Sequence, residues 1–454
     1  MVRTLKKELL DPFLGVDSQS QRLGQGDVLT VYGEIPEDIQ SGVYLSINRK
    51  GVNGIHSLGN PQPAKFIPEV PRWAVRKFLK KGQTVLDPFV GSGTTMVEAR
   101  ILGVNSYGID HNPLARLLSK VKSTPLEYSE IVESKRKLQN AIFDDIILKD
   151  VEIPEFRNRD FWFDHSASEG IAVIRNCIER EMKSSDIKDF FIVVLSEIIQ
   201  QVSRVGSGQI LPAKRSKNGE KARVTRKEVC QLFLERLNED TVKMREFSAK
   251  ADRTVFSEIV GDDARKISTP NTVDLIVTSP PYINSHHYIW TNKLRLLQLR
   301  LIDDEERLQL MRKEIGTEEF STEEYKDLGK TDIEELDKRI EQIYQGDKYK
   351  ASGDQNRIRA RSVFRYFSDM KTHLAQAFET LRPDSHYVLV VGNNKICKVD
   401  IPTPLFLEQI AREIGFNKIL QFQIILKNRT LNLPRNVPWA DITLYDQVLV
   451  LRRV

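Results

Sequence analysis

Cysteine is scarce in this sequence of 454 residues, which contains three: Cys177, Cys230 and Cys397. They lie far apart and none belongs to a CxxC pair, so neither a disulfide framework nor a zinc site is predicted. The adjacent His286 and His287 have no third candidate ligand beside them, and we therefore expect no metal. This low cysteine content fits a reducing compartment, and the cytoplasm is the predicted location.

Long apolar runs and a strong charge of one sign are also lacking. No run approaches the ~20 residues that a helix needs to cross a bilayer, and Met1–Lys7 leads into no apolar signal-peptide segment. No internal repeat or low-complexity tract is present. The 68 Lys and Arg residues stand against 63 Asp and Glu, a net charge of +5. This weakly basic balance permits a nucleic-acid partner without requiring one.

What the sequence does contain is a series of short, β-branched runs separated by helical patterns. The first five runs have helical patterns between them, so we predict parallel strands for these. The last two do not, so one of them is predicted to run antiparallel at the edge of the sheet. The predicted fold class is α/β, with a seven-stranded, doubly wound, mostly parallel sheet and an inserted helical region. The seven strands begin near Thr84, Ser106, Val255, Val273, Tyr387, Ile419 and Gln447.

The fourth strand, Val273–Val277, runs into the pentapeptide Thr-Ser-Pro-Pro-Tyr at 278–282. Two prolines end the strand because neither can donate to a sheet ladder. The Ser279 hydroxyl and the Pro280 carbonyl are two acceptors suited to an exocyclic amino group, and Tyr282 offers a flat face for a planar ring. The alternative is a Pro-Pro turn with a packed tyrosine, and this stretch alone leaves both interpretations open.

A glycine-containing turn follows the first strand, in the stretch from Asp87 to Thr95. Gly91 and Gly93 would let the backbone approach a ligand closely, and Thr94 or Thr95 would cap the next helix. The turn has no P-loop lysine, and the dinucleotide fingerprint lacks its third glycine. The second strand ends about twenty residues later at Asp110, an acid placed to accept from the two hydroxyls of a ribose. A nucleoside-like ligand is favoured over a capping aspartate.

The remaining segments carry weaker signals. Residues 1–50 form an N-terminal extension with two strand-like pieces that can make a hairpin. Residues 126–250 are helical, and a basic loop from Arg204 to Lys227 has eight cations against one acid. This loop is either solvated or an arm on a phosphate backbone, and both interpretations stay open. Residues 303–355 are dense in charge and predict one or two exposed helices. The loop residues considered for nucleic acid are Arg204, Lys214, Arg215, Lys217, Lys221 and Arg223.

The chain resembles the amino-directed DNA methyltransferases that use S-adenosylmethionine, whose fold is the Rossmann-like class I methyltransferase. The resemblance lies in Asp-Pro-Phe-Val-Gly-Ser-Gly at 87–93, in Ser-Pro-Pro-Tyr at 279–282 and in the order of the strands. Pro-Ala-Lys-Phe-Ile-Pro at 63–68 is similar to the motif that precedes the glycine turn in that family. The match covers roughly 56–122, 255–300 and 362–453.

The resemblance implies roles by position. The target base is held by Ser279, Pro280, Pro281 and Tyr282. The adenine amino group meets Asp263 or its neighbour Asp262. The cofactor is contacted by Lys65, Phe66, Asp87, Pro88, Phe89, Gly91, Gly93, Thr94, Asp110, Asp262 and Asp263. It also implies domains: a cofactor half at 51–125, a catalytic half at 251–302 and 356–454, and the helical basic insertion at 126–250 as a target-recognition region. The charged insertion at 303–355 is a second contributor to recognition.

The implied activity is methylation of the exocyclic N4 amino group of a cytosine flipped out of duplex DNA. The serine of Ser-Pro-Pro-Tyr resembles the cytosine-N4 branch more than the adenine-N6 branch, which is the runner-up because the same tetrapeptide occurs there too. Cytosine-C5 methylation is rejected, because none of the three cysteines follows a proline. Further alternatives are an RNA base methyltransferase and an inactive DNA-binding protein on this scaffold. The implied role is restriction-modification, with a cognate endonuclease as a partner.

Overall fold

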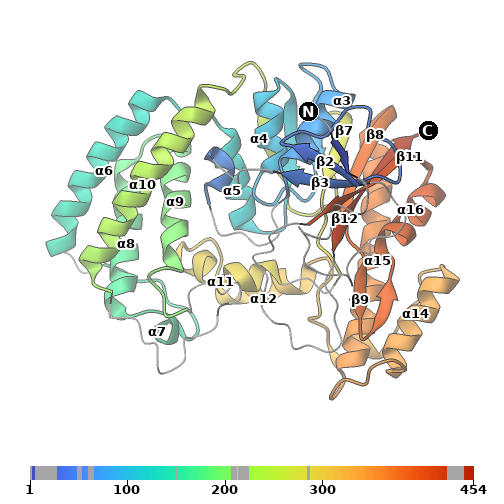
Figure 1. Cartoon of the computed structure of the whole chain (residues 1–454). Coiled ribbons are helices and arrows are strands. Elements are labelled where there is room, and N and C mark those ends of the chain that lie inside the picture. The colour runs from blue at the N-terminus through green and yellow to red at the C-terminus, as the bar shows by residue number, and fades with distance from the viewer. Residues whose placement is uncertain are drawn as a thin grey trace.

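One large β-sheet organises the chain, whose structure is a computed structural model describing residues 3–5, 28–48, 54–59, 66–148, 151–205, 212, 224–283, 287–426 and 444–454. The described strands are ordered β1-β2-β3-β11-β12-β8-β7-β4-β5-β6 (Figure 1). Their bounds are β1 Arg3–Leu5, β2 Val28–Tyr32, β3 Tyr44–Asn48, β4 Thr84–Asp87, β5 Asn105–Ile109, β6 Ser257–Gly261, β7 Val273–Thr278, β8 Leu381–Val391, β11 Phe416–Ile425 and β12 Tyr445–Arg453.

The seven predicted strands form the continuous block from β11 to β6, which confirms the predicted α/β class. The pairs β4–β5, β4–β7, β5–β6 and β7–β8 are parallel, as the helical connections predicted. Strand β12 runs antiparallel to both β8 and β11. Its predicted position at the edge is wrong, because β12 inserts between β8 and β11 and three further strands continue the sheet beyond β11.

The N-terminal strands are paired differently from the prediction. Strands β2 and β3 run parallel, with Val28 opposite Tyr44, so the hairpin is wrong. The eleven residues 33–43 join them. This connection is too long for a tight hairpin turn, and it returns the chain to the end of the sheet where β2 began, so that β3 runs in the same direction. Strand β3 then pairs in parallel with β11, so the extension belongs to the sheet.

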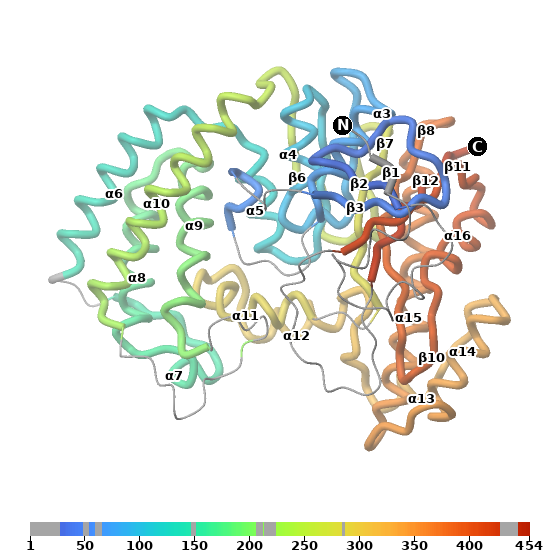
Figure 2. Tube along the Cα trace, viewed as in Figure 1, coloured from blue at the N-terminus to red at the C-terminus, as the bar shows by residue number. Residues whose placement is uncertain are grey.

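Helices cover both faces of the sheet because its strands alternate between two apolar faces. In β4, Val85 packs on the face covered by α3 and α4, whereas Leu86 packs on the face covered by α15 and α16. Figure 2 shows these layers on the right of the view. The bounds are α3 Glu69–Phe78, α4 Thr94–Ile101, α5 Pro113–Ser123, α15 Gln355–Thr380 and α16 Thr403–Ile414.

The helical region predicted between the two halves forms a bundle beside the sheet, on the left of Figure 1. Its apolar core continues into α5 through Leu114 and Leu118, and into α11 through Ile289 and Leu294. The bundle is therefore packed on the sheet's own helices. Its bounds are α6 Tyr128–Leu148, α7 Arg159–Trp162, α8 His165–Glu181, α9 Ser185–Ile199 and α10 Arg226–Ser248, with α11 at Tyr288–Gln298.

The charged insertion holds three described helices, not one or two, and they are not simply exposed. Leu336, Ile340 and Ile343 of α14 are buried in the core shared with α15. Acidic and basic residues cover its outer face, which explains why composition alone suggested exposure. The bounds are α12 Asp304–Lys313, α13 Thr322–Lys326 and α14 Glu334–Gln345. A small hairpin, β9 Asn394–Ile396 and β10 Val399–Ile401, and the 3-10 turn Gly54–Ser57 were not predicted.

Among the described helices, none combines the length and the apolar character needed to span a bilayer. The same residues contain no group of three or more His, Cys, Asp or Glu side chains arranged to hold a metal ion.

Candidate active site

A pocket opens where the central parallel strands end at the carboxyl edge of the sheet. Residues that closely follow four strands line it: Pro88 after β4, Asp110 after β5, Asp263 after β6 and Ser279 after β7. Strand β4 has β5 as its neighbour on one side and β7 on the other, so the order of the strands reverses at β4. Open α/β sheets bind ligands at such a reversal of strand order. The space between the protein atoms is about 1170 Å³, part of it open to solvent.

Asp87 lies beneath the pocket and holds its floor together. The residue is 2% exposed, and its carboxylate accepts hydrogen bonds from Thr95 Oγ1 and Thr278 Oγ1, both at 2.6 Å, and from the Phe89 amide at 3.1 Å. It thus joins the ends of β4 and β7 to the first turn of α4. Burial raises the pKa of Asp87 to about 6, although these three hydrogen bonds act in the opposite direction. Asp87 itself does not line the pocket.

The glycine bend above Asp87 brings main chain to the pocket wall. Gly91 has φ +50°, in the left-handed region, and its amide donates to Asp110 Oδ2 at 2.8 Å. Gly93 precedes α4 with φ +80°, and a Cβ there would lie 2.7 Å from Ser119 Cα. The bend therefore needs glycine at Gly93 both for its backbone conformation and for its close approach to α5.

We expect Gly93→Ala to lower the free energy of unfolding by about 3 kcal/mol, from the left-handed conformation and the overlap with the α5 backbone together. Gly82→Ala is the matched control, because Gly82 has φ +79° and no atom lies within 4 Å of the place that an added Cβ would occupy. It should cost only the conformational part, about 1 kcal/mol. Urea unfolding measures both. Equal losses would show that the contact with Ser119 relaxes freely.

Two acidic side chains face one end of the pocket. Asp110 accepts from the amides of Gly91 and Asn112, both at 2.8 Å, and burial raises its pKa. Asp263 is bound by Arg265 through two guanidinium contacts of 2.8 and 3.1 Å, and the hydrogen bonds and charge of Arg265 hold the pKa of Asp263 below its usual value despite burial. Both carboxylates keep lone pairs for a polar ligand. Asp262 is exposed and does not line the pocket.

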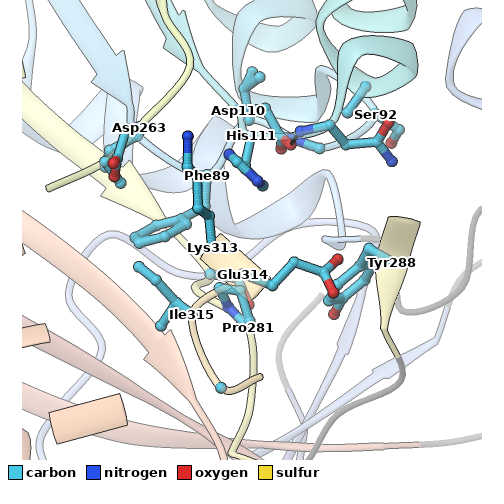
Figure 3. Close-up of a pocket in the computed structure, with 18 of the residues that line it drawn as sticks. Phe89, Ser92, Asp110, His111, Asp263, Pro281, Tyr288, Lys313, Glu314 and Ile315 are labelled. Atoms are coloured by element: carbon cyan, nitrogen blue, oxygen red, sulfur yellow. Dashed lines mark hydrogen bonds between the residues drawn. The ribbon is translucent and has the colours of Figure 1, made fainter. Parts of the chain in front are cut away.

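The opposite end is formed by the Ser-Pro-Pro segment and the start of α11. Ser279 and Pro281 line the pocket, as do His287 and Tyr288. In Figure 3, Pro281, Glu314 and Tyr288 lie across the pocket from Asp110 and His111. Pro280 is buried and does not line it.

Tyr282 turns away from this pocket. Its hydroxyl donates to Asp446 Oδ1 of β12 at 2.5 Å, and burial raises its pKa well above the ordinary value. The aromatic face that the pocket presents on this side belongs instead to Tyr288, which the sequence did not single out.

A third wall comes from the charged insertion and was not predicted. Residues 313–317, at the end of α12 and just beyond it, close the pocket beside α11. Arg265 Nη2 donates to the Lys313 carbonyl at 3.0 Å, and His111 Nε2 lies 3.0 Å from the Leu310 carbonyl, so the insertion is tied to the loops after β5 and β6. The one signal was the Ile-Gly-Thr break at 315–317 in an otherwise charged stretch. Other lining residues that were missed are Val90, Ser92, Asn112, Ala115 and Ala264.

The structure brings most of the predicted cofactor residues to this one pocket. Those that line it are Phe66, Pro88, Phe89, Gly91, Thr94, Asp110 and Asp263. Lys65 lies outside the described residues, as do Lys214, Lys217, Lys221, Arg215 and Arg223 of the basic loop. Arg204 is described: its guanidinium pairs with Asp164 and donates to the Asp160 carbonyl within the helical bundle.

Comparison with known proteins assigns the family. Residues 36–121 match the N6/N4 methyltransferase family model, described as a DNA methylase. The chain is 24% identical over 422 residues to Type II methyltransferase M.MvaI of Kocuria varians, covering 86% of this chain and 89% of that protein. It is 26% identical over 405 residues to Type II methyltransferase M.BsoBI of Geobacillus stearothermophilus, covering 78% and 77%. The chain belongs to the N4/N6 DNA methyltransferase family.

A further relative matches only locally. Type II methyltransferase M.MjaII of Methanocaldococcus jannaschii is 41% identical over 73 residues, which cover 16% of this chain and 13% of that protein. This N4/N6 methyltransferase uses S-adenosylmethionine as its methyl donor.

The pocket of this N4/N6 methyltransferase suits a charged nucleoside. Asp110 and Asp263 offer carboxylate oxygens at one end, and Phe66 and Phe89 add aromatic ring surface to the lining. The main chain at Gly91 carries no side chain that would fill the space. Acceptors for hydroxyl and amino hydrogens, with aromatic surface for a base, are the groups that hold an adenosyl moiety.

Proposed function

We propose that this enzyme methylates the exocyclic N4 amino group of cytosine in duplex DNA, as the modification enzyme of a restriction-modification pair. The observation that carries the proposal is the sharing of one pocket by Ser279 and Pro281 with Asp110 and Asp263. An amine held at the first pair would face a methyl donor held at the second. A serine at 279 favours cytosine over adenine by resemblance. A cognate endonuclease for the same site is the partner that this role implies.

The residues of the chain act by orientation. An aryl amine is a poor nucleophile because its lone pair is delocalised into the ring. The Ser279 hydroxyl and the Pro280 carbonyl would accept the amino hydrogens and turn the lone pair toward the donor, so positioning supplies most of the rate. The target base must leave the duplex to reach this depth. Tyr288 lines the pocket and Tyr282 does not, so Tyr288 is a second candidate for the stacking surface that the flipped base needs.

Asp110 is proposed to accept from the ribose hydroxyls of the cofactor, and Asp263 from its adenine amino group. Asp263 is preferred to Asp262 because it lines the pocket. When bound, the cofactor supplies an electrophilic methyl group on a sulfonium sulfur. Phe66 and Phe89 would flank it, and Asp87 would act on it indirectly by holding the bend.

The test is base analysis after reaction of duplex DNA with cofactor labelled in the transferred methyl group. Label in N4-methylcytosine supports the proposal, and label in N6-methyladenine would replace it with the adenine reaction. Offering tRNA and rRNA beside DNA tests an RNA base substrate. A calorimetric titration with the cofactor tests the inactive alternative, which predicts no binding heat.

The basic loop is proposed to hold the DNA backbone, with the helical region at 126–250 and the insertion at 303–355 reading the sequence. Replacing Lys214, Arg215 and Lys217 by glutamate should lower DNA affinity at least tenfold and reduce the slope of log affinity against log salt by about 3, at about 0.9 per lost phosphate contact. Fluorescence anisotropy at several salt concentrations measures both. Lys80→Glu is the control, because Lys80 is exposed between α3 and β4 and lies outside the loop and both regions proposed to contact DNA. An unchanged slope would assign the loop to solvent.

A further inference from the structure

Methylation of an amine releases a proton, which some group near the amine must accept. When the nitrogen forms its new bond it becomes positively charged, and one of its hydrogens must leave for the neutral product to form. The Ser279 hydroxyl and the Pro280 carbonyl can accept hydrogen bonds, but neither keeps a proton at neutral pH. The Ser-Pro-Pro segment itself therefore contains no base.

Three titratable groups of the pocket already have hydrogen-bond partners, and they lie across the pocket from Ser279. Asp110 accepts from two backbone amides, and Asp263 is bound by Arg265. His111 has both ring nitrogens against carbonyl oxygens, Nδ1 at 3.3 Å from Asp262 and Nε2 at 3.0 Å from Leu310. These three side chains come from the loops after β5 and β6.

One pair on the Ser279 side has the arrangement of a base and its orienting group. His287 Nδ1 lies 3.1 Å from Glu314 Oε2, while Glu314 Oε1 accepts from the Ile289 amide at 2.9 Å. Glu314 is thereby fixed at the start of α11, with its side chain 10% exposed. His287 Nε2 has no hydrogen-bond partner among the residues that the structure describes. The residue lines the pocket with Ser279 and Pro281.

We propose that His287, oriented by Glu314, accepts the proton that the target amine loses on methylation. The inference rests on the proposed function, since it needs an amine at Ser279. The Glu314 carboxylate accepts a hydrogen bond from the Nδ1–H of His287. In this tautomer Nε2 carries no proton and can accept one, which is the usual arrangement of a histidine base and its carboxylate.

The step balances without another reactant. The amine nitrogen forms a bond to the methyl carbon, the bond from that carbon to sulfur breaks, and its electron pair stays on sulfur. The positive charge moves to nitrogen and then, with the proton, to His287 Nε2. The imidazolium formed is stabilised by Glu314 and returns its proton to water after the product leaves.

The charges around His287 suit this role. The hydrogen bond to Glu314 raises the pKa of His287 above its ordinary 6.5 despite burial, and the charges of Glu314, Glu318 and Glu319 act in the same direction. Lys313 is the cation of the same wall. A base works best when its pKa lies near the working pH. Activity should thus rise with pH as His287 loses its proton, with a midpoint above 6.5.

The experiment compares His287→Gln with the wild type in single-turnover reactions on duplex DNA. Glutamine can fill the space but cannot take the proton, so the rate should fall on the order of 10²-fold. Cofactor and DNA affinities, measured by calorimetry and anisotropy, should stay unchanged. His287→Ala should regain part of the rate when imidazole is added. A wild-type rate in His287→Gln, or a loss of cofactor affinity equal to the loss of rate, would overturn the proposal.

A second pair of variants tests the role of Glu314 through pH. Glu314→Gln removes the charge that raises the pKa of His287, so the midpoint of the pH–rate curve should move down. Glu37→Gln makes the same chemical change on an exposed side chain between β2 and β3, outside the pocket and outside the regions proposed to read DNA, and should leave the curve in place. Equal curves for both variants would overturn the proposal.

Failure of this proposal can be told from failure of the proposed function. Base analysis of the DNA from the same single-turnover reactions identifies the labelled base. Label in N6-methyladenine would replace cytosine by adenine as the target, irrespective of how His287→Gln behaves. Label in N4-methylcytosine with an unchanged rate in His287→Gln would leave the function in place and remove only the base.

Discussion

Ser279→Ala should lower the single-turnover rate of methyl transfer by roughly 10³-fold while cofactor affinity stays near normal. Removal of one positioned group at a reacting centre costs about 10²–10³ in rate, and here the change also frees an amino hydrogen that must be held for the lone pair to point at the donor. Ser279 is half-buried at the end of β7 and lines the pocket opposite Asp110. Alanine fits that position without a clash.

The contrasting variant is Asp110→Asn, on the other side of the same pocket. It should weaken cofactor binding while the rate at saturating cofactor changes little, because Asp110 is proposed to hold the ribose and not the amine. Single-turnover kinetics and calorimetry on both variants separate the two roles. If Ser279→Ala lost cofactor affinity as strongly as rate, the assignment of Ser279 to the base would be wrong.

Asp87→Ala should lower the free energy of unfolding by about 4 kcal/mol, because it leaves several buried donors without an acceptor. Thr95, Thr278 and the Phe89 amide all donate to this carboxylate. Asp87→Asn keeps one carbonyl oxygen and should cost less than half as much. Urea unfolding gives both values. Asp144→Ala, on the exposed side of α6, is the matched control and should change stability little.

The pH dependence of Asp87 has a definite sign. Its pKa in the folded protein is raised to about 6, against 3.8 for an ordinary aspartate, so the folded state binds this proton more tightly than the unfolded state. The stability that this proton contributes is therefore fully present below pH 3.8 and is lost as pH rises through about 6. Between about pH 5 and pH 7.5 the wild type should lose about 1 kcal/mol relative to Asp87→Asn. A constant difference would contradict the raised pKa.

The sequence predicted the central sheet well because local signals there agree with the fold. The β-branched runs at Thr84 and Val273 are buried on both faces, and helical patterns between the runs force parallel pairing. The glycine bend and Asp110 are close in sequence and close in space, with Gly91 donating to Asp110. These parts of the pocket could be found from one stretch of chain.

The rest of the site depends on contacts that no local pattern records. Glu314 reaches the pocket from a charged insertion and meets His287 across 27 positions of sequence. Arg265 reaches the carbonyl of Lys313 across 48 positions. Their side chains are ordinary surface residue types, and composition alone predicted exposure. The motif predicted that Tyr282 faces the ligand, but its bond to Asp446 depends on where β12 inserts, which the sequence placed at the edge.

The extra N-terminal strands also bear on how the protein avoids aggregation. Gln423 and Ile424 of β11 pair with Tyr44 and Leu45 of β3, so part of the outer margin of the seven-stranded block is covered by the chain's own backbone. A fragment that began near the glycine bend would expose those amides and carbonyls as a template for a strand from another molecule. Shortened expression fragments should therefore retain the segment at 28–48 even though it lies far from the chemistry.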